Sequence, residues 1–219
     1  MIKTDVVVGA IGGFCAGAVL GVFYGNQLSA DWAANIIGAG LAAALSIWGA
    51  FAVAARQATE KEREFERFAS EVVSNVRDEA EYASLLVVHS EGVKNENDRK
   101  RAQLRAVFQH RRLMTALEVF EKHVADESAG SFMVRLAALK MSKEITAARA
   151  LMSGQAEKRL QTGKTDESGK VWGDVAQIQV AAQSFLGEIG AKQRFVGGDK
   201  LKERQEELDH DIFTAGYDL

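Results

Sequence analysis

The chain has 219 residues, of which 47% are hydrophobic and 26% are charged, and its formal net charge is -3. This slightly acidic balance gives nucleic-acid binding no support from global charge. The single cysteine, Cys15, excludes an intrachain disulfide and a cysteine metal cluster. We predict no metal and no cofactor, and the complete absence of proline favours an all-helical fold.

Two apolar segments, residues 6–25 and 32–55, contain no charged side chain. Each is long enough to cross a hydrocarbon core of about 30 Å as a helix. The connector between them is very short, so the two helices must be antiparallel neighbours. The sequence therefore predicts a two-helix transmembrane hairpin over residues 1–55.

Basic residues near the two spans predict the orientation of the hairpin. Lys3 precedes the first span, the connector has no basic residue, and Arg56, Lys61 and Arg63 follow the second span. We expect a multi-pass protein of the inner (plasma) membrane with both termini in the cytoplasm. A cleaved signal peptide at residues 1–25 is the alternative.

Small residues recur at every fourth position of both apolar segments. The two rows that they form, here called the small-residue ridges, are Gly9, Gly13, Gly17, Gly21 and Gly25 in the first segment and Ala34, Gly38, Ala42, Ser46 and Ala50 in the second. Glycine and alanine let membrane helices approach closely, so we predict that the ridges pack helices together. A row spaced by four winds around its helix, which favours several neighbours and hence a homo-oligomer in the lipid bilayer.

Two polar side chains, Asn35 and Ser46, lie inside the second span. One interpretation is hydrogen bonding between helices, and the other is that these side chains line a pore. Neither span holds a carboxylate, which argues against a proton-driven rotor.

Residues 56–219 are predicted to form a cytoplasmic helical domain. Since 51–91 contain neither glycine nor proline, the second span is expected to continue as one helical stalk until Gly92. An apolar stripe follows on this helix, for which a domain core and a parallel coiled coil are the alternatives. The stripe consists of Phe65, Phe68, Val72, Val76, Ala83 and Leu86.

Further helices are expected at 98–126, 131–160, 171–195 and 199–213, with Asp98 and Asp199 as N-caps and a polar loop at 162–170. The predicted fold class is all-α. A two-helix transmembrane hairpin continues through a helical stalk into a cytoplasmic helical bundle.

A basic segment, 99–112, carries six arginine or lysine residues and no acidic residue. Arg101, Arg105 and Arg112 share one helical face and are candidate anion-binding residues for a phosphate-bearing ligand. The alternative partner is the acidic C-terminus, within or between subunits. Its carboxylates are Glu203, Glu206, Glu207, Asp209, Asp211 and Asp218.

Within this segment, Arg105 is followed after four residues by His110. The spacing resembles that of the HEPN family of helical ribonucleases, in which arginine and histidine of two subunits face each other and cleave RNA without a metal. The resemblance implies that His110 would transfer protons and Arg105 would stabilise phosphate charge.

These patterns favour a homo-oligomeric membrane protein that acts as a pore-forming or gated effector or channel, controlled by its cytoplasmic domain. They favour a mechanical or assembly role over an enzymatic one. A membrane-tethered ribonuclease is one alternative. A passive membrane anchor or scaffold for a cytoplasmic protein is another.

Overall fold

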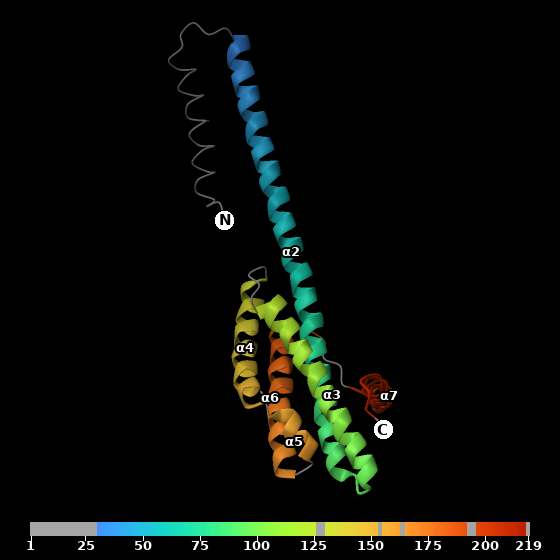
Figure 1. Cartoon of the computed structure of the whole chain (residues 1–219). Helices are drawn as coiled ribbons and strands as arrows, with labels where there is room; N and C mark the ends of the chain where they lie inside the picture. The colour runs from blue at the N-terminus through green and yellow to red at the C-terminus, as the bar shows by residue number, and fades with distance from the viewer. Residues whose placement is uncertain (1–29, 126–129, 153–154, 163–164, 192–195, 218–219) are drawn as a thin grey trace. The chain divides into compact units, whose positions relative to one another are not determined.

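The computed structural model describes residues 30–125, 130–152, 155–162, 165–191 and 196–217 (Figure 1). These residues form six α-helices and one π-helical segment, and this part of the chain contains no β-strand, so the predicted all-helical class is confirmed. In chain order the elements are α2 (Ala30–Gly92), α3 (Glu96–Phe120), the π-helical η1 (Glu121–Ala125), α4 (Phe132–Met152), α5 (Ala156–Thr162), α6 (Thr165–Glu188) and α7 (Gly198–Thr214).

The chain divides into two compact units, Met1–Glu60 and Lys61–Leu219. In the first unit the described element is the N-terminal part of α2. From Gly38 onward this helix is long and apolar enough to cross a membrane, and none of its most apolar 18-residue stretch is buried. The predicted first span, its ridge from Gly9 to Gly25 and Cys15 lie outside the described residues, so the hairpin stays a prediction.

The predicted second span and the residues that follow it form one continuous helix, as expected. α2 continues without interruption through 51–91 and ends at Gly92, as the absence of glycine and proline predicts. Glycine is among the residues that favour helices least, which fits its place at the terminus.

Both predicted N-caps are wrong. α3 begins at Glu96, because the side chain of Asn95 already accepts a hydrogen bond from the Asn97 backbone N–H at 3.2 Å. Asp98 lies instead in the first turn, where its negative charge suits the helix dipole. α7 begins after Gly197, which has no side chain to form a cap, and Asp199 likewise lies in the first turn.

Three other predicted boundaries also differ from the structure. The helix expected at 131–160 is two helices, α4 and α5, and the sequence between them includes Gly154, a residue of low helix propensity. The expected loop at 162–170 is mostly helical, since α6 begins at Thr165. α6 ends before 195 because Gly190 adopts a φ of 69° and the Ala191 N–H donates to the Leu186 carbonyl, a glycine-terminated helix end.

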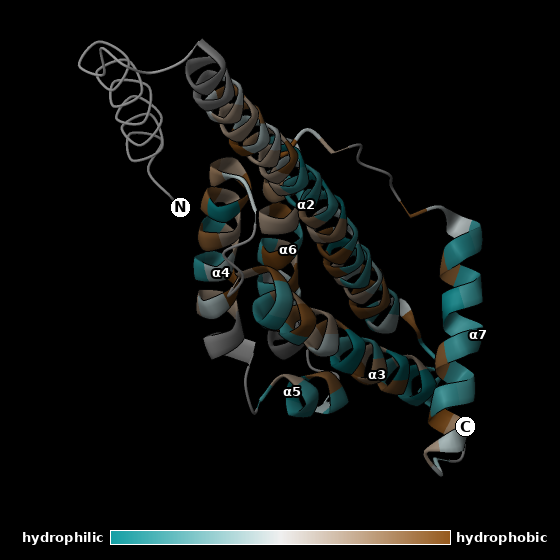
Figure 2. Ribbon diagram, turned by 90° about the horizontal axis from the view of Figure 1, so that it is seen from above, coloured by the Kyte–Doolittle hydropathy of each residue, from teal (hydrophilic) through white to brown (hydrophobic). Residues whose placement is uncertain are grey.

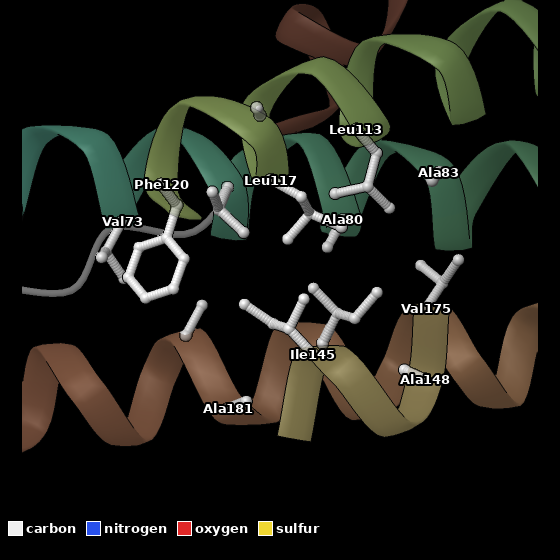
Figure 3. Close-up of a cluster of buried hydrophobic side chains, with 14 of the residues drawn as sticks. Val73, Ala80, Ala83, Leu113, Leu117, Phe120, Ile145, Ala148, Val175 and Ala181 are labelled. Atoms are coloured by element: carbon white, nitrogen blue, oxygen red, sulfur yellow. The ribbon is translucent and has the colours of Figure 1, made fainter. Parts of the chain in front are cut away.

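The second unit has its own hydrophobic core, to which α2, α3, α4 and α6 contribute (Figure 3). On α2 the fully buried positions repeat at intervals of three and four residues, the period of one helical face. They are Ala69, Val73, Val76 and Ala80. Phe120 of α3 packs edge to face on Phe185 of α6, with ring centroids 6.3 Å apart.

The apolar stripe of α2 is thus a domain core at most of its positions. Val76, Ala83 and Leu86 are buried within this chain, which favours the core interpretation over a coiled coil. Phe68 is the exception, because it is 42% exposed and its ring lies 6.4 Å from that of His123.

Candidate functional site

The candidate site is built on one face of α3. At about 100° per residue, Arg101, Arg105, Phe108 and Arg112 fall within roughly 60° of one another around the helix. α7 lies against α3, and its surface is mostly hydrophilic (Figure 2). The basic face of α3 therefore meets the acidic C-terminal helix.

α7 docks through a narrow apolar seam with carboxylates on both sides. Leu208 and Ile212 are fully buried and lie one helical turn apart. By helical geometry Asp209 lies on one side of this seam, and Glu207 and Asp211 lie on the other. Each side of α7 can therefore reach different arginines of α3.

On one side, two arginines share the carboxylate of Asp209. Arg105 donates from Nε to Oδ1 at 2.6 Å and from Nη2 to Oδ2 at 2.5 Å. Arg101 donates to the same two oxygens at 3.4 and 2.5 Å. Burial opposes ionisation of this carboxyl, but the hydrogen bonds from Arg105 and Arg101 outweigh it and hold the pKa of Asp209 below its usual value.

On the other side, Arg112 binds two carboxylates. Its Nη1 donates to Glu207 at 3.0 Å, and its Nη2 donates to Asp211 at 2.6 Å. Desolvation works against the charged guanidinium, yet these two hydrogen bonds raise the pKa of Arg112. The alternative partner of the basic segment, the acidic C-terminus, is thus present within the same chain. Whether Arg101, Arg105 and Arg112 also bind an external anion stays a prediction.

A buried polar junction joins α7 to α2 and α3, and the sequence did not predict it. Glu79 on α2 accepts from Gln109 Nε2 at 2.6 Å and from Arg204 Nη2 at 2.8 Å. The Arg204 guanidinium carbon also lies 4.6 Å from the centre of the Tyr82 ring. The sequence did contain one signal, a single carboxylate among the apolar positions of α2. A buried carboxylate is tolerated on such a face only when it is paired.

A cleft opens between α2, α3 and α7, with a volume of ≈ 370 Å³. Its lining combines three guanidinium groups, two polar uncharged side chains, two carboxylates and an apolar wall. The residues are Arg111, Arg112 and Arg204; Asn75 and Thr115; Glu79 and Asp211; and Phe108, Ala116 and Val119. This composition suits an anionic ligand that has an apolar part.

The arginine and histidine of the ribonuclease resemblance point in different directions. Five residues apart, Arg105 and His110 lie about 140° apart around α3. Arg105 binds Asp209, whereas His110 is buried and both of its ring nitrogens lack a hydrogen-bond partner in the described structure. Burial lowers the pKa of His110, with a smaller opposing effect from Glu157. Within one chain the two side chains form no shared site, and the pairing of two subunits stays a prediction.

In the candidate span, Gly38, Ala42, Ser46 and Ala50 lie on α2 and are exposed. A Cβ atom added at Gly38 would meet nothing within 4 Å. Ser46 donates its hydroxyl to the Ala42 carbonyl at 2.8 Å, so it is satisfied within its own helix. α2 includes Ala34 and Asn35, whose side chains lie outside the described part.

Among the described residues, no group of three or more His, Cys, Asp or Glu side chains is arranged to hold a metal ion. Comparison of the chain with protein-family models, curated proteins and solved structures finds no match.

Proposed function

We propose that this protein is a homo-oligomeric, multi-pass inner-membrane protein whose spans assemble into a pore that the domain Lys61–Leu219 controls from the cytoplasm. One observation carries the proposal. The apolar part of α2 that begins at Gly38 is long enough to span a bilayer, yet none of its most apolar stretch is buried in the part of the chain that the structure describes. Such a surface requires lipid, other copies of the chain, or both.

The two sides of this segment suit two different environments. At about 100° per residue, Gly38, Ala42, Ser46, Gly49 and Ala50 occupy roughly one third of the helix circumference. Large apolar side chains occupy most of the remainder, namely Leu41, Leu45, Ile47, Trp48 and Phe51, whereas Val53, near the C-terminal end of the segment, lies on the small side. The small face supports close packing between helices, and the large face supports contact with lipid.

The continuity of α2 supports control by the helical domain. The same helix that carries Ala42 and Trp48 also supplies the buried Val73, Val76 and Ala80 to the core of the second unit. A change in the packing of that core therefore acts on residues of the helix that enters the membrane. α7 is positioned to influence this packing because Arg204 holds Glu79, one residue before Ala80.

The test is ion flux through liposomes that contain the purified full-length protein. Ala42→Leu places a large side chain on the small face, whereas Ala44→Leu makes the same change about 200° away, among the large side chains. We expect flux from the parent and from Ala44→Leu, and loss of flux in Ala42→Leu. Absence of flux from the parent under all conditions, including disruption of the α7 ion pairs, would contradict the pore. A passive membrane anchor or scaffold would then be the better explanation.

The ribonuclease alternative makes a separate prediction. It expects His110→Ala to abolish RNA cleavage while the oligomer stays intact. Equal cleavage by that variant and the parent, or no cleavage by either, would end it.

A further inference from the structure

Two arginines that line the cleft converge on one oxygen atom. Arg112 Nη1 lies 3.0 Å from Oε2 of Glu207, and Arg204 Nη1 lies 3.3 Å from the same oxygen. The Glu207 side chain is 56% exposed, whereas those of Arg112 and Arg204 are 31% and 16% exposed. Two partly buried cations thus hold a carboxylate that can swing into solvent at little cost.

The other side chains around this point suit a larger anion. Arg111, whose guanidinium already pairs with Glu157 at 2.8 Å, also lines the cleft, and Thr115 and Asn75 bring a hydroxyl and an amide. Arginine forks bind phosphate oxygens in pairs, and a phosphate offers more oxygens and more charge than a single carboxylate. Phe108 adds an apolar wall, and its ring lies 5.1 Å from the Arg111 guanidinium carbon.

α7 keeps other attachments when Glu207 leaves. Leu208 and Ile212 stay in the apolar seam. Asp209 stays bound to Arg105, and Arg204 can keep its 2.8 Å contact with Glu79. An incoming anion therefore needs to displace one exposed carboxylate and not the whole helix.

We propose that this cleft binds a phosphomonoester or pyrophosphate group, which replaces the carboxylate of Glu207 between Arg112 and Arg204. Glu207 then acts as a built-in competitor that sets the affinity for the anion. The apolar wall at Phe108 accommodates the organic part of the ligand. This binding does not depend on whether the membrane segment forms a pore.

Calorimetric titration of the detergent-solubilised full-length protein with inorganic pyrophosphate tests the proposal. Glu207→Gln should tighten binding about tenfold, because it removes the competing charge and leaves the arginines in place. The matched control is Glu203→Gln, which makes the same change of charge at an exposed position of α7. Its affinity should stay within about threefold of the parent, since Glu203 does not line the cleft and an exposed charge is screened.

A loss-of-function variant and a lipid arm complete the experiment. Arg112→Gln should weaken binding at least about tenfold. Circular dichroism and hydrogen exchange would reveal whether that variant releases α7. If it does, the comparison of Glu207→Gln with Glu203→Gln alone tests the proposal. In parallel, protein in nanodiscs with phosphatidic acid or with phosphatidylcholine alone is titrated with pyrophosphate. Weaker pyrophosphate binding in nanodiscs with phosphatidic acid than in those with phosphatidylcholine alone identifies a lipid headgroup as the source of the phosphate. Equal, full binding in the two kinds of nanodisc identifies a soluble ligand.

Two results would overturn the proposal. One is no saturable binding of pyrophosphate by the parent or Glu207→Gln and no competition by phosphatidic acid. The other is equal affinity in the parent, Glu207→Gln and Arg112→Gln, which would show that the anion binds elsewhere. Since flux is not the readout, neither result bears on pore formation.

Discussion

Arg204 of α7 donates a hydrogen bond to Oε1 of Glu79 on α2 at 2.8 Å, and the two side chains are only 16% and 9% exposed. The other carboxylate oxygen accepts from Gln109 of α3. Three helices, α2, α3 and α7, thus meet at one buried carboxylate. Loss of its charge would leave Arg204 in a largely desolvated position with a weaker partner.

Glu79→Gln should therefore lower the free energy of unfolding by about 2 kcal/mol, the usual range for hydrogen bonds to charged groups. Urea titration of the solubilised protein measures this. The control is Lys100→Gln, which removes an ion pair whose side chains are 66% and 69% exposed. Its effect should be below about 0.5 kcal/mol, and equal losses in the two variants would contradict the buried junction.

The pairing of two arginines with Asp209 predicts how α7 opens. Arg105→Gln removes two of the hydrogen bonds to that carboxylate and should speed amide exchange in Gly198–Thr214 several-fold, because the free energy of local opening falls. Arg99→Gln makes the same change at an exposed position of α3. Hydrogen exchange followed by mass spectrometry compares the two. Unchanged exchange in Arg105→Gln would show that the apolar seam alone holds the helix.

His110 predicts a loss of stability in mild acid. Burial lowers its pKa in the folded protein, so below about pH 6.5 the unfolded chain binds a proton that the folded chain does not bind. This contribution to stability is present at neutral pH and is lost as pH falls from about 6.5 towards the lowered value. Glu157 and Arg111 are the charged groups that act on the imidazole, in opposite directions.

The Tm of the parent should accordingly fall between about pH 7.5 and pH 5.5, and His110→Leu should reduce that fall because leucine does not titrate. His89→Leu, at an exposed position of α2, should leave it unchanged. The same pH dependence in the parent and His110→Leu would assign the effect to other groups.

The contact of Phe120 with Phe185 predicts the cost of a core cavity. Phe120 is fully buried, so Phe120→Ala should reduce the free energy of unfolding by about 3–5 kcal/mol. Phe68→Ala, at a position that is 42% exposed, should cost clearly less. Urea titration checks both variants, and a similar cost for the two would contradict the assignment of Phe68 to the periphery of the core.

The helical class and the length of α2 could be predicted because they depend on local features. No proline occurs, and no glycine interrupts 51–91. Helix ends were harder to place, because several residues compete for each cap. Asn95 precedes Asp98 and caps α3 first, and Gly190 ends α6 through a backbone conformation that sequence spacing does not show.

The candidate site was predicted in part. Opposite charge on the basic segment and the C-terminus indicated their contact, which Arg105 and Asp209 make. The convergence of Arg112 and Arg204 on Glu207 could not be read from the sequence, because it depends on how α7 crosses α3. The partners of Glu79 could not be predicted for the same reason, since they come from other helices.

We propose that other copies of this chain cover the small face of α2. The most direct test is the mass of the purified protein in mild detergent for the parent, Ala42→Leu and Ala44→Leu. We expect one defined oligomer for the parent and for Ala44→Leu, and smaller species for Ala42→Leu, because leucine holds the helices apart. A monomeric parent, or an unchanged mass in Ala42→Leu, would show that copies of the chain do not pack through this face.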